Sequence, residues 1–257
     1  MKTALVLSAG GMFGAYQAGV WNVLEHVLRP DVVIGSSVGS INGWAIAGGI
    51  SGEELTRTWL DPRCATLMQP RVPRRPWHAY FDPAPLREMV RELTSAYTPQ
   101  VPFALAVTRL PQLRLELLEM PGLTAEHVVA SCAIPVGYPP VRIGGQMYCD
   151  GGLLSVMPLW AAPRFGVDRA IAVNVLPSMP LNALRAGVRM VRLLAPREPR
   201  VTGIEVLRLG PPRVLGTMHD AITWEPENMR RWIARGEADA EALVRGPQFK
   251  SAESRFV

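Results

Sequence analysis

Short apolar runs alternate with helical patterns over the first fifty residues. Thr3–Leu7 is apolar and runs into Ser8-Ala9-Gly10-Gly11, which predicts a buried strand that enters a glycine turn. Residues 14–28 place small and apolar side chains at helical spacing, so we expect a helix that packs closely on a sheet. Residues 31–34 predict a second strand, and a small-residue helix pattern begins at Val38. This order predicts the opening of a parallel α/β sheet.

One interruption divides this pattern from the rest of the chain. Ser51 and Glu54 form a capping-box pattern at the start of a short helix that ends near Leu60. Residues 61–85 contain six prolines among arginines and aromatic residues, which predicts a long irregular excursion over the surface. After it we expect a helix at 86–96, strands at 103–107 and 113–117, a helix at 124–132 capped by Thr124, a hairpin of 141–143 and 146–148 around Gly144-Gly145, a helix at 159–165, a strand at 170–175, a helix at 181–194, a strand at 204–209 and an amphipathic helix at 227–244 with an interior Gly236.

Length and composition set the class of protein. A chain of 257 residues with 48% hydrophobic content can bury a substantial core, and we take residues 1–257 as a single α/β domain. No apolar run approaches the roughly 20 residues that cross a bilayer, and the first strand is too short for a secretory core. Cys64, Cys132 and Cys149 are odd in number and lack metal-ligand spacing, which favours three free thiols in a reducing compartment. We therefore expect a cytoplasmic protein, peripheral to any membrane that it contacts.

The charge pattern narrows the partners. The net charge is +5, and only Lys2 and Lys250 among the 27 basic residues are not arginine. No long basic run or basic face interleaved with aromatic residues is present, so we expect no nucleic-acid partner. Within residues 61–85, three arginines (71, 74 and 75) lie near Trp77, Tyr80 and Phe81. This segment is interpreted either as a flap that touches an anionic membrane surface or as a loop packed on the domain.

The pentapeptide Gly35-Ser36-Ser37-Val38-Gly39 directly follows the second expected strand. In a Gly-x-Ser-x-Gly elbow, a tight turn from strand to helix lifts the serine hydroxyl above the sheet, and crowding there favours glycine on both sides. Ser37 is therefore the candidate nucleophile, with Gly35 and Gly39 as its supports. Such a short motif also arises by chance, so its surroundings must decide its meaning.

Gly10 and Gly11 lie between the first strand and a helix that starts near Gly14. Amides without side chains at a helix N-terminus can bind negative charge, which makes these two residues candidate donors to an oxyanion. The alternative is a dinucleotide-binding turn, because residues 9–14 nearly match its glycine fingerprint. Against it, Ala9 replaces the first glycine, and the second strand ends in Gly-Ser-Ser where a ribose-binding acid is expected.

Four histidines and one aspartate are candidates for the base that activates Ser37. The histidines are residues 26, 78, 127 and 219, of which only His127 lies on an expected helix that could approach the site; a packed or solvated histidine is the alternative. Asp150-Gly151-Gly152 follows the expected strand at 146–148, although an aspartate before two glycines also suits a plain turn. An aspartate within hydrogen-bond reach of Ser37 can act as the base, and partial burial helps by raising its pKa above about 3.9.

Three separated stretches together resemble the patatin-like phospholipase family. Residues 7–19 resemble its glycine-rich oxyanion loop, 35–39 its nucleophile elbow and 150–152 its catalytic aspartate motif. Residues 130–135 and 139–141 also resemble the segment that this family places before that aspartate. The resemblance covers about residues 3–176 and leaves a tail of about 180–257. The chain departs from the family at Ala9, usually a third glycine, at Phe13, usually basic, and at Ser155 and Val156, commonly asparagine.

The resemblance implies a single-domain, three-layer patatin-like fold, with a mostly parallel central sheet and helices on both faces. It implies a dyad of Ser37 and Asp150 without a catalytic histidine, oxyanion amides at Gly10 and Gly11, and no metal or cofactor. Supporting roles fall to Gly14, Gly35, Gly39, Gly151 and Gly152. The expected reaction is hydrolysis of lipid esters through an acyl-enzyme. Acyl transfer to another alcohol, and lipid binding by a degenerate site without turnover, are the alternatives. Headgroup, chain length and oligomeric state stay open.

Overall fold

The computed structural model describes residues 1–71, 79–176, 195–196 and 198–250. Eight strands form one mixed sheet with the order β5-β6-β3-β2-β1-β7-β8, and β4 also pairs with β3. The neighbours along β3, β2, β1, β7 and β8 are parallel, whereas β4, β5 and β6 join by antiparallel pairing. The strands are β1 (Thr3–Leu7), β2 (Val32–Ser36), β3 (Phe103–Leu110), β4 (Arg114–Glu119), β5 (Val141–Ile143), β6 (Gln146–Asp150), β7 (Arg169–Val173) and β8 (Glu205–Leu209).

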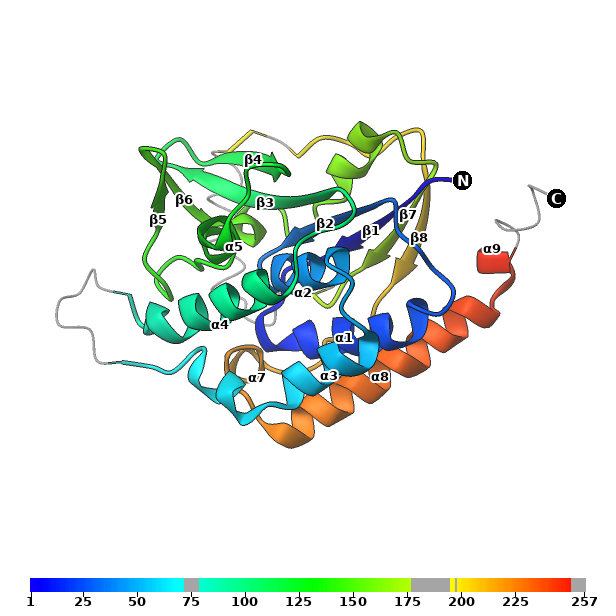
Figure 1. The fold of residues 1–257 in the computed structure, drawn as a ribbon, viewed down its shortest axis with the longest axis horizontal. Helices are drawn as coiled ribbons and strands as arrows, with labels where there is room; N and C mark the ends of the chain where they lie inside the picture. The colour runs from blue at the N-terminus through cyan, green and yellow to red at the C-terminus, as the bar shows by residue number, and fades with distance from the viewer. Residues whose placement is uncertain (72–78, 177–194, 197, 251–257) are drawn as a thin grey trace.

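Helices cover the sheet, and Figure 1 shows α1, α3 and α8 side by side along one flank of the molecule. The α-helices are α1 (Gly14–Leu24), α2 (Val38–Ala47), α3 (Gly52–Leu60), α4 (Pro83–Ala96), α5 (Ala125–Ser131), α7 (Met218–Ile222), α8 (Pro226–Arg245) and α9 (Pro247–Lys250). The 3₁₀ helices are η1 (Gly11–Phe13), η2 (Pro62–Thr66), η3 (Gly151–Leu153) and η4 (Leu159–Phe165). Among the described residues, no helix is both long and apolar enough to cross a membrane.

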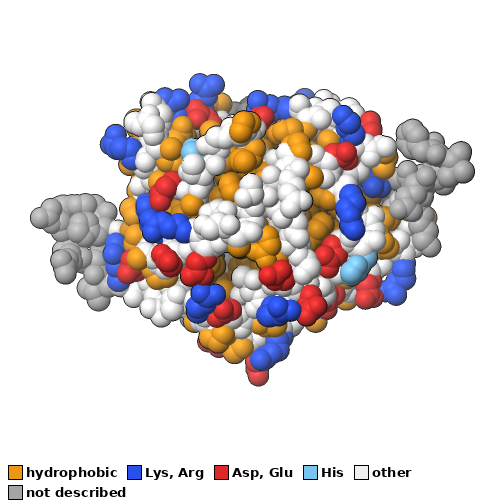
Figure 2. Space-filling model, viewed as in Figure 1, with side chains coloured by type: hydrophobic (Ala, Val, Ile, Leu, Met, Phe, Trp, Pro, Cys, Tyr) orange, Lys and Arg blue, Asp and Glu red, His pale blue; other side chains and the backbone are white. Residues whose placement is uncertain are grey.

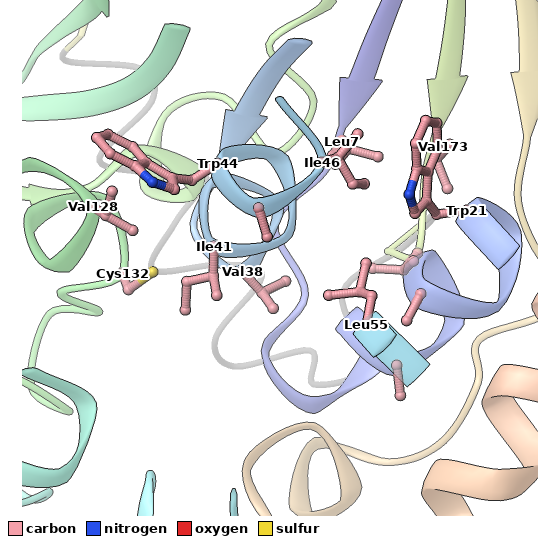
Figure 3. Packing of buried hydrophobic residues seen from close by; sticks show 14 of the residues in the cluster. Leu7, Trp21, Val38, Ile41, Trp44, Ile46, Leu55, Val128, Cys132 and Val173 are labelled. Carbon is pink, nitrogen blue, oxygen red and sulfur yellow. The ribbon is translucent and has the colours of Figure 1, made fainter. Parts of the chain in front are cut away.

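The sheet divides the core into two parts because side chains alternate along each strand. Leu5 and Leu7 of β1 point into the larger part, which the helices α1, α2 and α8 close. Ala4 and Val6 point into the smaller part, which η4 covers. Every residue of α2 is buried, as expected for a largely apolar helix that lies between the sheet and other helices. Figure 3 shows side chains of α2 packed between the sheet and the neighbouring helices.

Strand β3 determines where the carboxyl ends of two other strands meet. Strand β4 pairs with β3 along residues 104–109, so β2 and β6 share the opposite edge of β3, end to end. Ser36 at the end of β2 pairs with Ala106, and Asp150 at the end of β6 pairs with Val107, the next residue of β3. Because β2 is parallel to β3 and β6 is antiparallel, the two strands run toward each other. The residues that end or follow β2 and β6 therefore lie close together.

Most expected elements are present, including the hairpin and the long C-terminal helix, and the predicted α/β class is confirmed. The expected helix at 14–28 is wrong at its end, because α1 stops at Leu24, a few residues before Pro30. The expected helix at 159–165 is a 3₁₀ helix, and it contains Pro163. The expected helix at 181–194 lies outside the described residues.

The expectation of an irregular excursion at 61–85 is only partly right. Residues 62–66 form η2, and α4 begins at Pro83 rather than at 86. Prolines are tolerated in the first turn of a helix, where their missing N–H would have no partner, and the Asp82 side chain caps the Ala84 amide at 3.0 Å. Arg71 and Tyr80 are joined by a backbone hydrogen bond of 2.8 Å, and residues 72–78 lie outside the described part of the chain.

Candidate active site

Ser37 occupies the turn between β2 and α2 with φ 52° and ψ −127°. Positive φ is unusual for a residue other than glycine and is typical of a strained nucleophile elbow. The two glycines beside Ser37 leave no room for a side chain. A Cβ at Gly35 would lie 2.3 Å from the Gly39 carbonyl oxygen, and one at Gly39 would lie 2.4 Å from the Leu7 carbonyl oxygen. Glycine is therefore required on both sides of Ser37, as the motif predicts.

Ser131 at the end of α5 holds the elbow from the other side. Its Oγ accepts a hydrogen bond from the Ser37 amide at 3.0 Å and donates to the Ala106 carbonyl at 2.8 Å. The Ser40 hydroxyl lies 2.7 Å from the same Oγ. One buried hydroxyl thus connects β3, α5 and the first turn of α2. The sequence does not predict this role of Ser131, because these bonds span up to 94 residues, and its place in the stretch 130–135 is the one available signal.

Asp150 lies directly against Ser37. The Ser37 Oγ donates to Asp150 Oδ2 at 2.6 Å, and the Gly152 amide donates to Oδ1 at 2.6 Å. Burial raises the pKa of Asp150 to about 7, and the two hydrogen bonds act in the opposite direction. A carboxylate with this pKa is a far better proton acceptor at neutral pH than an ordinary aspartate. The pair can therefore exchange a proton without an imidazole.

The described histidines are occupied elsewhere. The Nδ1 of His127 lies 2.9 Å from the Thr124 hydroxyl and 3.1 Å from its amide nitrogen, so the ring caps α5. Partial burial lowers the pKa of His127, and Glu126 acts in the opposite direction. The Nε2 of His26 lies 3.9 Å from Glu25 Oε1, and the Nε2 of His219 lies 3.4 Å from Thr223 Oγ1. His78 falls outside the described residues. No described histidine hydrogen-bonds to Ser37 or Asp150.

The three cysteines are free thiols, as expected, and all are buried. Burial raises the pKa of Cys149 to about 12, and it raises that of Cys132 as well. Both thiols are therefore protonated at neutral pH and are weak nucleophiles, although Cys132 lies beside Ser37. Within the part of the chain that the structure describes, no group of three His, Cys, Asp or Glu side chains could hold a metal ion.

Gly10 and Gly11 lie at the start of η1, and α1 follows at Gly14. Among the described residues, neither amide donates to a protein acceptor. Gly11 has φ 56° and lines the same pocket as Ser37. A Cβ at Gly10 would lie 2.3 Å from Val175 Cγ2, and one at Gly11 would lie 2.3 Å from the Ala221 carbonyl oxygen of α7. The two free amides are thus held in place by close packing on both sides.

A buried amide network fixes the strand that leads into this loop. Gln17 Nε2 donates to the Ser8 carbonyl at 2.8 Å, and Asn42 Nδ2 donates to Gln17 Oε1 at 3.0 Å. The indole of Trp59 then donates to Asn42 Oδ1 at 3.0 Å. This chain of hydrogen bonds links the end of β1 with α1, α2 and α3. Its partners are distant in sequence, so no local pattern indicates it.

The departures at Ala9 and Phe13 are absorbed by packing. The Ala9 methyl group lies 2.7 Å from the position that a Cβ would take at Gly152, so the extra carbon occupies space that Gly152 leaves open. Phe13 is 0% exposed, and its ring meets that of Trp232 edge to face with centroids 4.9 Å apart. Trp232 belongs to α8, so the tail of the chain supports the glycine loop. At Ser155, the hydroxyl donates to Glu198 at 2.6 Å.

A pocket with largely apolar walls opens beside Ser37. Its empty volume is about 630 Å³, including the part open to solvent. Figure 2 shows hydrophobic side chains in the middle of the face that it views, with charged residues around them. In Figure 3, Val38, Ile41 and Cys132 lie close together near the start of α2. The main walls are Val38 and Ile41 of α2, Leu55 and Trp59 of α3, and Leu86, Met89 and Leu93 of α4.

Comparison with known proteins gives one family and one shared fold. The sequence model of the Patatin-like phospholipase family matches residues 5–163. VipD from Legionella pneumophila is 15% identical with a TM-score of 0.52, over 95% of this chain and 66% of that one. The type III effector protein ExoU is 15% identical with a TM-score of 0.45, over 95% of this chain and 53% of that one. The chain thus spans just under two thirds of VipD and about half of ExoU, and the likeness to VipD shows the fold alone.

Proposed function

Because the chain belongs to the patatin-like phospholipase family, we propose that it is a serine acyl hydrolase of lipid esters in which Ser37 and Asp150 form the catalytic dyad. The observation that carries this proposal is the 2.6 Å hydrogen bond from the Ser37 hydroxyl to a buried carboxylate, formed on a strained elbow. The family match agrees with the resemblance seen in the sequence. The apolar pocket beside Ser37 suits the acyl part of a lipid ester.

The mechanism follows from these positions. Asp150 takes the proton of Ser37 as Oγ attacks the ester carbonyl, and the amides of Gly10 and Gly11 donate to the oxygen that becomes negative. Collapse of the tetrahedral intermediate breaks the ester bond, and protonated Asp150 returns its proton to the departing alcohol. Asp150 then removes a proton from water, which attacks the acyl-enzyme. As the second tetrahedral intermediate collapses, protonated Asp150 returns its proton to Ser37 Oγ and the fatty acid leaves, which restores both residues. Transfer to another alcohol in place of water would use the same groups.

We expect a fluorophosphonate to label Ser37, at a rate that falls about tenfold for each pH unit below about 7, because Asp150 must be ionised to accept the proton. Labelling is followed by mass spectrometry of the intact protein and of its peptides over a pH series. A protein that binds lipid without turnover stays unlabelled.

The His127→Gln variant serves as the matched control for the base. Its labelling should keep the same acid limb, since the His127 ring caps α5 and does not contact Ser37 or Asp150. Loss of the acid limb in a folded His127→Gln protein would assign the proton transfer to the imidazole and contradict the role of Asp150.

We also propose that the enzyme meets its substrate at an anionic membrane surface. Tyr80 and Val136 are 46% and 84% exposed and are joined by a backbone hydrogen bond of 2.9 Å. Val136 has φ 72°, which is strained for a β-branched residue. The neighbouring ring of Phe81 contacts Tyr138, which lines the pocket beside Ser37. An exposed apolar pair next to the pocket, with Arg71 beside it, suits contact with lipid headgroups and acyl chains.

Changing Arg71, Arg74 and Arg75 together to Gln should weaken binding to anionic vesicles strongly at low salt and less at high salt, because each basic residue contributes about 1 kcal/mol near such a surface. A Tyr80→Ser, Val136→Ser variant should lose vesicle binding at both salt concentrations. Hydrolysis of a short soluble ester should change little in either protein. Val27→Ser removes a valine that is 43% exposed elsewhere and is the control. Equal losses on vesicles and on the soluble ester would refute the membrane contact.

A further inference from the structure

A second cavity adjoins the pocket beside Ser37. Four residues line both spaces: Thr58 at the end of α3, Cys64 of η2, Leu67 just after η2, and Met89 of α4. Since the same side chains face both spaces, the partition between them is one side chain thick. The partition is formed by the segment from α3 to just after η2 on one side and by α4 on the other.

Three of these four residues are fixed in place. The Thr58 hydroxyl donates to the Glu54 carbonyl at 2.9 Å, and the Cys64 thiol donates to the Thr58 carbonyl at 3.3 Å. Leu67 is 7% exposed, and its carbonyl accepts a hydrogen bond from the Tyr138 hydroxyl. Met89 is only partly buried and has an unbranched side chain with several rotatable bonds. Met89 is therefore the member of the partition that can move most easily.

The two spaces are similar in size and differ in their surroundings. The empty volume, including the part open to solvent, is about 630 Å³ beside Ser37 and about 660 Å³ beyond the partition. The outer cavity has charged residues at its edge, among them Arg63, which pairs with Asp61 and Glu92 at 2.9 Å each. A chain end that passed the partition would leave largely apolar walls for a space that charged residues help to line. The length of acyl chain that fits beside Ser37 alone therefore depends on the partition.

We propose that the two spaces are successive segments of one acyl channel and that Met89 separates them, so that Met89 limits the length of the acyl chain. This inference rests on the proposed hydrolase function. A short chain fits between α2, α3 and α4 with Met89 in place. A longer chain reaches the outer cavity only when the Met89 side chain turns aside, which costs packing with its neighbours.

The test is a series of straight-chain p-nitrophenyl esters from about 4 to about 16 carbons. Because a few methylene groups in an apolar pocket change kcat/KM by about tenfold or more, Met89→Ala should raise the ratio of long-chain to short-chain kcat/KM by at least about tenfold. Met89→Phe should lower this ratio. Met147→Ala truncates a partly buried methionine on β6 that lines neither space, and its chain-length profile should match the parent. Thermal unfolding checks that each variant is folded.

A binding measurement separates failure of this inference from failure of the proposed function. In the Ser37→Ala background, free fatty acids of the same lengths compete with a fluorescent fatty acid, and Met89→Ala should shift the preferred length upward. A shift in the preferred fatty-acid length, together with no ester hydrolysis by the protein that retains Ser37, would contradict the hydrolase function and support the channel. A folded Met89→Ala protein with the parent's chain-length profile, or a shift of equal size in Met147→Ala, would overturn the role of Met89.

Discussion

Ser37→Ala and Asp150→Asn are each expected to lower ester hydrolysis by about 10⁴-fold or more, and the double variant is expected to lose little beyond either one. The reason is that, in the proposed dyad, the hydroxyl and the carboxylate act as a unit. A serine without its base is a poor nucleophile, and a base without the serine has no proton to take. The measurement is kcat/KM on one soluble ester for the parent, both single variants and the double variant.

Stability measurements distinguish lost chemistry from lost structure in these variants. The pKa of Asp150 is raised in the folded protein, so ionising this group opposes folding, and stability falls as the pH rises from about 4 to about 7. Asp150→Asn removes that cost, and the variant should be at least as stable as the parent above pH 7. Ser36→Ala is the neighbouring control for turnover, because the Ser36 hydroxyl donates to the Ser155 carbonyl at 3.2 Å and does not bond to Asp150.

Near-normal turnover of folded Asp150→Asn would refute the dyad.

Gly10→Ala is expected to lower kcat by about a hundredfold or more, because the new methyl group would lie 2.3 Å from Val175 Cγ2 and would push the Gly10 amide away from the oxyanion. The structure also indicates how to reverse this loss. Val175 Cβ would lie 3.6 Å from the added Cβ, so Val175→Ala removes the contact and leaves an ordinary distance. The double variant Gly10→Ala, Val175→Ala should recover most of the activity.

Gly11→Ala provides the contrast within the same loop. Its added Cβ would lie 2.3 Å from the Ala221 carbonyl oxygen and would be held at φ 56°, and neither backbone problem can be relieved by trimming a side chain. Val175→Ala should therefore fail to rescue Gly11→Ala. Equal kcat for Gly10→Ala and the parent, with both proteins folded, would mean that the Gly10 amide does not serve the reaction.

Local patterns predict the parts of this protein that local physics controls. The apolar run of β1, the elbow at Ser37 and the hairpin around Gly144-Gly145 each depend on residues close in sequence, and each is present. Thr217 and Asp220 form a reciprocal capping box at the start of α7, a local signal that is also readable in the sequence. The expected start of the helix at residue 86 is wrong, because α4 begins at Pro83 and holds its prolines in the first turn, where proline is tolerated.

The parts that sequence could not predict are contacts between distant segments. The resemblance of residues 150–152 to a family motif pointed to Asp150, but only the pairing of β2 and β6 with adjacent residues of β3 explains why it reaches Ser37. The packing of Phe13 on Trp232 likewise joins the glycine loop to the tail of the chain. Such contacts depend on tertiary packing and leave no periodic signal.

The end-to-end arrangement of β2 and β6 along β3 also orders events during synthesis and unfolding. Ser37, the proposed nucleophile, belongs to the N-terminal part of the sheet. Asp150, the proposed base, follows 113 residues later at the end of the β5–β6 hairpin, which the other strands do not need for their own pairing. A chain leaving the ribosome can therefore build the elbow before its base exists. Conversely, detachment of the β5–β6 hairpin from the sheet edge would switch off the enzyme while the parallel strands stay folded. Loss of activity thus becomes an early reporter of local opening, ahead of global denaturation.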